Sequence, residues 1–148
     1  MAFVISENAK IYYRSAGTYA SPTWSEITLA KDVTLNLEKS DVDVTTRGSG
    51  GFTEYADGLI DASVEFSMLY DTADSAFSAF ESAFFNKTSV DMAIMDGDVS
   101  TTGSEGLRAI MMVGSFTRNE TLGEALMVDI SLKPVQNDDA NPSWYTVS

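Results

Sequence analysis

Asp96, Asp98 and Ser100 have the alternate spacing with which a calcium-binding loop begins. Such a loop needs a glycine at its sixth position and a bidentate glutamate at its twelfth, and here these positions hold Thr101 and Leu107. Because both of these elements are missing, a solvated turn is the better interpretation of the segment.

A glycine-rich run, Gly48-Ser49-Gly50-Gly51, follows Arg47 and could in principle surround a phosphate with backbone N–H groups. The run lacks the Gly-Lys-Ser/Thr ending of a phosphate-binding loop, and no helical pattern follows it. Flexibility of the backbone is therefore the better interpretation of these glycines.

Paired carboxylates such as Asp41 and Asp43 are of the type that glycoside hydrolases use. Residues two apart on a strand point to the same side, so this pair would lie on one solvated face. With 22 acidic residues among 148, such neighbours are expected by chance, and no second motif supports catalysis. Histidine and cysteine are both absent, which removes the commonest general base and any thiol nucleophile or ligand. We therefore predict that the protein is not an enzyme and has no metal or cofactor.

Two segments with alternating apolar and polar residues would position most of these acidic side chains. Residues 32–45 and 61–68 are each predicted to form a strand with one buried and one solvated face. Between them we predict a long hairpin arm, about Thr46–Leu59, whereas hairpin loops usually hold about 2–5 residues. A surface segment of this length commonly binds something, so we interpret it as an arm that orders against a neighbouring copy. Its candidate contact residues are Arg47, Gly48, Gly50, Gly51, Phe52, Glu54, Tyr55, Asp57 and Gly58.

The first of these strands changes phase along its length. Its apolar positions are odd-numbered from Val33 to Leu37 and even-numbered at Val42 and Val44. A change of one residue moves side chains to the other face, so we predict a β-bulge or bend near Lys39.

After the second strand the apolar spacing becomes helical. Phe77, Phe80 and Phe84 are spaced three and four apart, with serines and acidic residues on the opposite face. This pattern predicts one helix, about Thr72–Phe85, whose phenylalanines lie in the core. Further alternating segments follow, so we predict a mainly β fold, a rolled β-sandwich or barrel that carries one α-helix. We expect residues 1–148 to form a single domain.

The composition is strongly acidic, with 9 basic and 22 acidic residues and a net charge of -13. This balance argues against a surface that binds nucleic acid by neutralising its phosphates, and against adhesion to anionic membranes. No segment approaches the roughly 18 apolar residues of a membrane span. Hydrophobic residues make up 44% of the chain, which is enough to build a core.

The order of several motifs resembles the major tail tube proteins of long-tailed, siphovirus-like bacteriophages. The resemblance lies in the strand and turn at 32–47, in 60–66 after the glycine-rich arm, in Tyr70-Asp71 before the helix, and in Leu132-Lys133-Pro134. That family is similar in fold to the tube proteins of type VI secretion systems and contractile tails. The resemblance implies a rolled β-sandwich that self-assembles into six-membered rings, which stack into a tube for DNA delivery.

The resemblance also implies partners and a location. The partners would be further copies of the chain, a tape-measure protein inside the tube, and tail terminator and initiator proteins. DNA would pass through the tube without specific binding, and no membrane would be contacted. The subunit would lie in the virion tail, and in the host cytoplasm during assembly.

The acidic composition is consistent with such a conduit. Six copies of a chain with a net charge of -13 carry -78 per ring, and acidic groups facing the bore would repel phosphate. Screening falls off over about 10 Å at 0.1 M salt, so only groups that line the bore act directly. The candidates on solvated strand faces are Glu38, Asp41, Asp43, Glu65 and Asp129, and some of these could instead face neighbouring subunits.

An alternative function is a monomeric acidic β-sandwich that binds a carbohydrate or protein ligand. Tyr12, Tyr13, Tyr19 and Trp24 could form an aromatic platform for a sugar, although such residues more often serve packing. The arm discriminates between the two functions, because a tube subunit needs it for contacts and a monomeric module does not.

Overall fold

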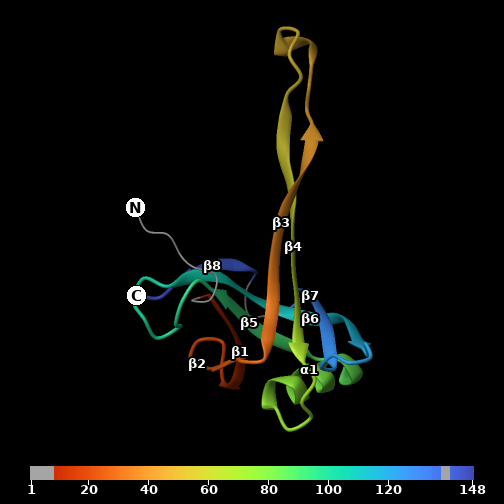
Figure 1. The fold of residues 1–148 in the computed structure, drawn as a ribbon. Helices are drawn as coiled ribbons and strands as arrows, with labels where there is room; N and C mark the ends of the chain where they lie inside the picture. The colour runs from red at the N-terminus through yellow and green to blue at the C-terminus, as the bar shows by residue number, and fades with distance from the viewer. Residues whose placement is uncertain (1–8, 138–140) are drawn as a thin grey trace.

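The computed structural model describes residues 9–137 and 141–148, which form one antiparallel sheet and one α-helix (Figure 1). Across the sheet the strands are ordered β2-β1-β5-β6-β7-β4-β3, and β8 pairs with the first part of β6. The bounds are β1 Lys10–Gly17, β2 Pro22–Glu26, β3 Ala30–Asp43, β4 Tyr55–Leu69, α1 Ser75–Asn86, β5 Ser89–Met95, β6 Glu105–Asn119, β7 Met127–Pro134 and β8 Ser143–Thr146. For these residues the predicted mainly β fold with one helix is confirmed, and the sheet is not closed into a barrel.

Helix α1 begins three residues later than the sequence predicts. Asp74 is its N-cap and accepts a hydrogen bond from the Phe77 N–H at 3.2 Å, which satisfies a donor that has no partner within the helix. Asp71 instead accepts the Ala73 N–H at 2.9 Å, so the residues before Asp74 form a turn. The helix is not long or apolar enough to span a membrane, and no other helix that could do so occurs in the described chain.

The core lies between α1 and the sheet. Phe80 is fully buried, with its ring centroid 5.5 Å from that of Phe66 on β4 and 6.1 Å from that of Tyr13 on β1. Phe77 is also buried, whereas Phe84 is half-buried and stacks on Phe116 of β6 at 6.0 Å. The helical spacing of the phenylalanines therefore places one apolar face of α1 on the sheet, as predicted.

Strands β3 and β4 form a hairpin that extends far beyond the rest of the sheet (Figure 1). Pairing runs from Ala30 opposite Met68, in the body, to Asp43 opposite Tyr55. The predicted arm is confirmed, although the part without strand pairing, residues 44–54, is shorter than predicted. We call residues 38–61 the arm, because all of them are exposed except Ser49, which is buried, and Gly58, which is half-buried.

Candidate interaction surfaces

A break in strand register separates the arm from the body. Between Lys39 and Asp41 β3 advances by two residues, while β4 advances by three, from Ile60 to Asp57. The predicted bulge is thus present, with its extra residue in β4. A Cβ atom at Gly58 would lie 2.6 Å from the backbone oxygen of Ser40, so glycine is needed for this close approach.

The tip of the arm is a hydrogen-bonded turn. Residues 47–49 form one 3-10 turn, in which the Thr46 hydroxyl accepts the Gly48 N–H at 3.2 Å and the Ser49 hydroxyl accepts the Thr46 N–H at 3.1 Å. Gly50 and Gly51 have φ values of 66° and 88°, in the left-handed region that favours glycine. The freedom of the glycine backbone is thus used here to close the turn, in a conformation that other residues rarely adopt.

Further bonds close the neck below this tip. The Thr45 hydroxyl accepts the Glu54 N–H at 2.8 Å, and the Val44 N–H donates to the Glu54 carbonyl at 3.0 Å. The Thr45 N–H donates to the Asp43 carboxylate at 2.9 Å. The hydrogen bonds of the tip and of the neck are therefore all formed within one chain.

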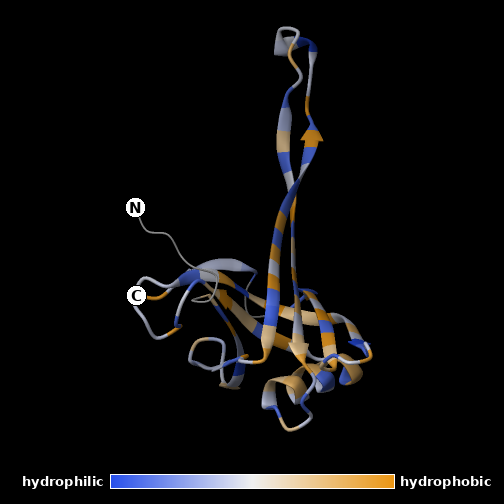
Figure 2. Ribbon diagram, viewed as in Figure 1, coloured by the Kyte–Doolittle hydropathy of each residue, from blue (hydrophilic) through white to orange (hydrophobic). Residues whose placement is uncertain are grey.

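The arm exposes apolar side chains that nothing in the described chain covers. Phe52 is 76% exposed and Leu59 is 86% exposed, and Tyr55 and Ile60 are also largely open to solvent. Figure 2 shows hydrophobic residues interspersed with hydrophilic ones along the arm. A two-stranded hairpin alone is at best marginally stable, and exposed apolar surface commonly marks an interaction site. The predicted contact residues from Arg47 to Gly58 all lie on this projecting element.

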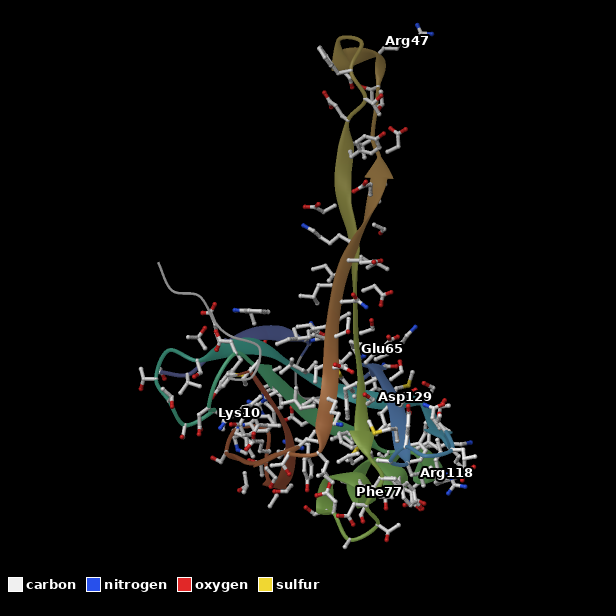
Figure 3. All side chains as sticks on the ribbon, viewed as in Figure 1. Lys10, Arg47, Glu65, Phe77, Arg118 and Asp129 are labelled. Atoms are coloured by element: carbon white, nitrogen blue, oxygen red, sulfur yellow. The ribbon has the colours of Figure 1, made fainter. Side chains whose placement is uncertain are left out.

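A polar face of the sheet lies at the base of the arm. Paired residues of neighbouring strands point to the same side, and Glu65 pairs with Thr34 and Ser131, while Asp129 pairs with Ser67 and Thr117. Glu65 and Asp129 are both exposed and lie near one another beneath the arm (Figure 3). Together with Asp32 they line a shallow depression of about 400 Å³. The side chain of Asn119 donates to Asp129 at 2.6 Å.

The five predicted bore-facing carboxylates fall into two groups. Glu38 pairs with Asp61 and has the same phase as Thr34, so it belongs to the polar face with Glu65 and Asp129. Asp41 and Asp43 lie beyond the bulge. Because β3 contains no extra residue between Leu35 and Asp43, these two have the phase of Leu35 rather than of Glu38. Three of the five carboxylates therefore share one face of the sheet, with Glu38 at the start of the arm, while Asp41 and Asp43 lie farther out on the arm and have the opposite phase.

The calcium-like segment is a turn whose carboxylates already have partners. Asp98 accepts the Ser100 hydroxyl at 2.7 Å and the Ser100 N–H at 2.8 Å, and these bonds lower the pKa of the Asp98 carboxyl. Asp96 accepts the Glu105 N–H at 2.9 Å. Throughout residues 9–137 and 141–148, no three acidic, histidine or cysteine side chains are grouped so as to hold a metal ion.

The predicted aromatic platform is instead part of a packed network around Arg108. The Arg108 guanidinium lies 3.8 Å from the Tyr19 ring centroid and 5.0 Å from that of Trp24. Arg108 donates to the buried Asp91 carboxylate at 2.9 Å, and Arg14 approaches the same carboxylate at 3.4 Å. The platform interpretation is therefore wrong for Tyr19 and Trp24, because their rings surround a buried cation rather than an open sugar site.

Tyr12 and Tyr13 do not join such a platform either. Both side chains are buried, and they belong to different apolar clusters, because successive residues of β1 point to opposite sides of the sheet. Tyr13 packs under α1, whereas Tyr12 packs with Ala93 and Met95. The aromatic residues of the N-terminal strands therefore serve packing.

No protein-family model matches the chain, and no curated protein matches its sequence. Solved structures match its fold. A chain in the tail of an empty gene transfer agent particle, determined with C6 symmetry, has 15% identity and a TM-score of 0.71, over 97% of this chain and 98% of that one. The SPP1 tail tube has 12% identity and a TM-score of 0.71, over 97% of this chain and 79% of that one. A chain of the anti-feeding prophage baseplate has 10% identity and a TM-score of 0.60, over 99% and 98%. The chain therefore shares the fold of tail tube proteins, as its motifs predict.

Proposed function

We propose that the protein is a structural subunit that self-assembles into stacked rings, which form a tail tube through which DNA is delivered. The arm is the observation that carries the proposal, because it exposes apolar side chains that the rest of the described chain leaves uncovered. The fold supports the same role, since it is shared with chains from a gene transfer agent tail and from the SPP1 tail tube. The role is structural rather than catalytic, and the whole chain acts as one domain.

Ring closure would use the two open edges of the sheet. Strands β2 and β3 end the strand order, so each has one side without a partner strand among the described residues. Such edges readily pair with another chain. The gene transfer agent tail has C6 symmetry, which supports a ring of six here. A tape-measure protein and terminator and initiator proteins would set the length and ends of the tube, in the virion tail after assembly in the host cytoplasm.

The polar face would line the bore. It presents Glu38, Glu65 and Asp129 on exposed positions, in a chain whose net charge is -13. Carboxylates there repel phosphate, so DNA would pass without being held. Asp41 and Asp43 would line the bore only where the arm itself reaches it.

The test is electron microscopy of the purified, concentrated protein. We expect rings or tubes of uniform diameter in negative stain, and a helical reconstruction in which Glu65 and Asp129 face the lumen. Sedimentation showing only monomer at high concentration, with and without an initiator protein, would exclude the assembly. Tubes with these two carboxylates on the outer surface would exclude the bore assignment alone.

A further inference from the structure

An apolar groove with a volume of about 870 Å³ lies beside α1, at the body end of the molecule. We call it the α1 groove, and its walls include Phe84, Phe85, Lys87, Met112, Val113 and Val135. Phe85 is 68% exposed, and Met112 is 43% exposed. Outside the β3–β4 hairpin, the other large apolar residues that are exposed in the described chain are Leu122 and Trp144. Two of the four exposed large apolar residues outside the hairpin therefore line the α1 groove.

Lys87 places a positive charge at the rim of this groove. It caps the C-terminus of α1 in the left-handed conformation, with φ 57°, and its N–H bonds to the Ala83 carbonyl. Glycine adopts this conformation without strain and is the usual residue at this position. A lysine here therefore carries an energetic cost in the backbone conformation. In the described part of the chain no carboxylate lies within ion-pair distance of Lys87. The groove thus suits a ligand that combines an apolar group with a negative charge.

The tip of the arm has this combination. Phe52 is 76% exposed, and Glu54, two residues on, is exposed and takes part in the hydrogen bonds of the neck through its backbone. The arm contains six acidic residues, namely Glu38, Asp41, Asp43, Glu54, Asp57 and Asp61, and two basic ones, Lys39 and Arg47, which gives a net charge of -4. Charge and hydrophobicity therefore both match the α1 groove.

The two surfaces lie at opposite ends of the molecule. The arm rises from one side of the body and α1 packs at the far end from the tip (Figure 1). Within one chain they cannot meet, but a head-to-tail contact between copies joins unlike surfaces and repeats without limit along an axis. We propose that the α1 groove of one copy binds the arm tip of a second copy, with Phe52 in the groove and Glu54 paired with Lys87. This inference rests on the proposed self-assembly and names the contact that would stack the rings.

Disulfide trapping tests this contact, because the chain contains no cysteine of its own. Assemblies of a Phe52→Cys, Phe85→Cys double variant should give a ladder of cross-linked multimers on a non-reducing gel. The matched control pairs Phe52→Cys with Leu122→Cys, which is fully exposed at the turn between β6 and β7. Trapping in the control and not in the Phe85 pair would overturn the proposal. If the wild-type chain forms no assembly at all, the proposed function fails as well.

A charge exchange tests the same contact without cysteines. Glu54→Lys and Lys87→Glu should each raise the critical concentration for assembly about tenfold, and the double variant should restore it to within about threefold. Arg118→Glu provides the control, since it reverses the same charge on an exposed position of β6 that does not line the groove. Monomer melting temperatures should be unchanged in all four variants. If the wild type assembles but the double variant does not regain the wild-type critical concentration, the pairing of Glu54 with Lys87 is overturned. The proposed self-assembly would still stand in that case.

Discussion

The β3–β4 hairpin passes through two environments, and the same alternating pattern has a different outcome in each. Near α1, Val64, Phe66 and Met68 of β4 are almost fully buried, because the helix covers that face of the sheet. On the side of Ala62 that faces the arm tip, the side chains of Ile60 and Leu59 are largely exposed, because nothing in the described chain covers them. Alternation therefore predicts which face is apolar, while tertiary context decides whether that face is buried. In the arm, no part of the described chain supplies the covering surface.

The two regions also differ in what holds them together. The body is stabilised by burial of aromatic and aliphatic side chains between α1 and the sheet. The arm relies on the strand ladder, the bulge at Gly58 and the turn bonds of Thr45, Thr46 and Ser49. Local bonds of this kind fix a shape but contribute little to the stability of the whole domain.

Removal of the arm should have the largest effect on assembly and almost none on the body. Lys39 and Ile60 are paired, so residues 40–59 can be replaced by Asn-Gly, which favours a two-residue hairpin turn. We expect no tubes under conditions where the wild type forms them, and a free energy of unfolding within about 1 kcal/mol of wild type. Negative-stain images and denaturant unfolding measure the two effects. An unfolded variant would show that the arm belongs to the core.

Phenylalanine truncations should separate the two regions by stability. Phe80→Ala empties a fully buried site and should lower the free energy of unfolding by about 3–5 kcal/mol. Phe52→Ala, on the exposed tip, should change it by no more than about 0.5 kcal/mol. Urea unfolding of the monomers gives both values. If both variants lost the same free energy of unfolding, the division between core and arm would be contradicted.

Gly58→Ala should disturb the arm alone. The new methyl group would collide with Ser40, and crowding of this kind costs about 1–3 kcal/mol, which the exposed hairpin can avoid by local opening. Hydrogen exchange should therefore accelerate in residues 41–57, while amides of β5 and β6 keep their protection. Gly48→Ala is the control, because the nearest atom to its Cβ would be 3.5 Å away. Uniform exchange changes in body and arm would show that the bulge is coupled to the core.

The sequence predicts periodic elements well and their ends less well. The spacing of Phe77, Phe80 and Phe84 reports burial directly, so the helix could be found from it. Its start could not be placed, because Asp71 and Asp74 are both suitable caps and the hydrogen bond to Phe77 decides between them. The strand phase similarly revealed the bulge, although the extra residue lies in β4 rather than in β3.

The network around Arg108 could not be predicted from the periodicity of the sequence. Asp91 and Arg108 each interrupt an apolar run of a strand, which is a signal of burial with a partner. Their pairing depends on the register that sets Ala93 opposite Arg108, and on the loop that brings Tyr19 over the guanidinium. Both are long-range features, so the aromatic residues alone leave a surface platform open as the less favoured alternative to packing.

The smallest predicted effect concerns protonation at the neck of the arm. The Thr45 hydroxyl and the Thr45 backbone N–H lower the pKa of the Asp43 carboxyl below its usual 3.8. A carboxyl whose pKa is lower in the folded arm stabilises that fold above the ordinary pKa, and this contribution is lost as the pH falls through the folded value. Carboxyl-carbon NMR titration should give an Asp43 pKa below that of a carboxyl without such bonds, and Thr45→Ala should raise it while the backbone bond remains. An Asp43 pKa that does not respond to this substitution would mean that the neck turn is not formed in solution, and that the arm acquires its shape only on contact with a second copy.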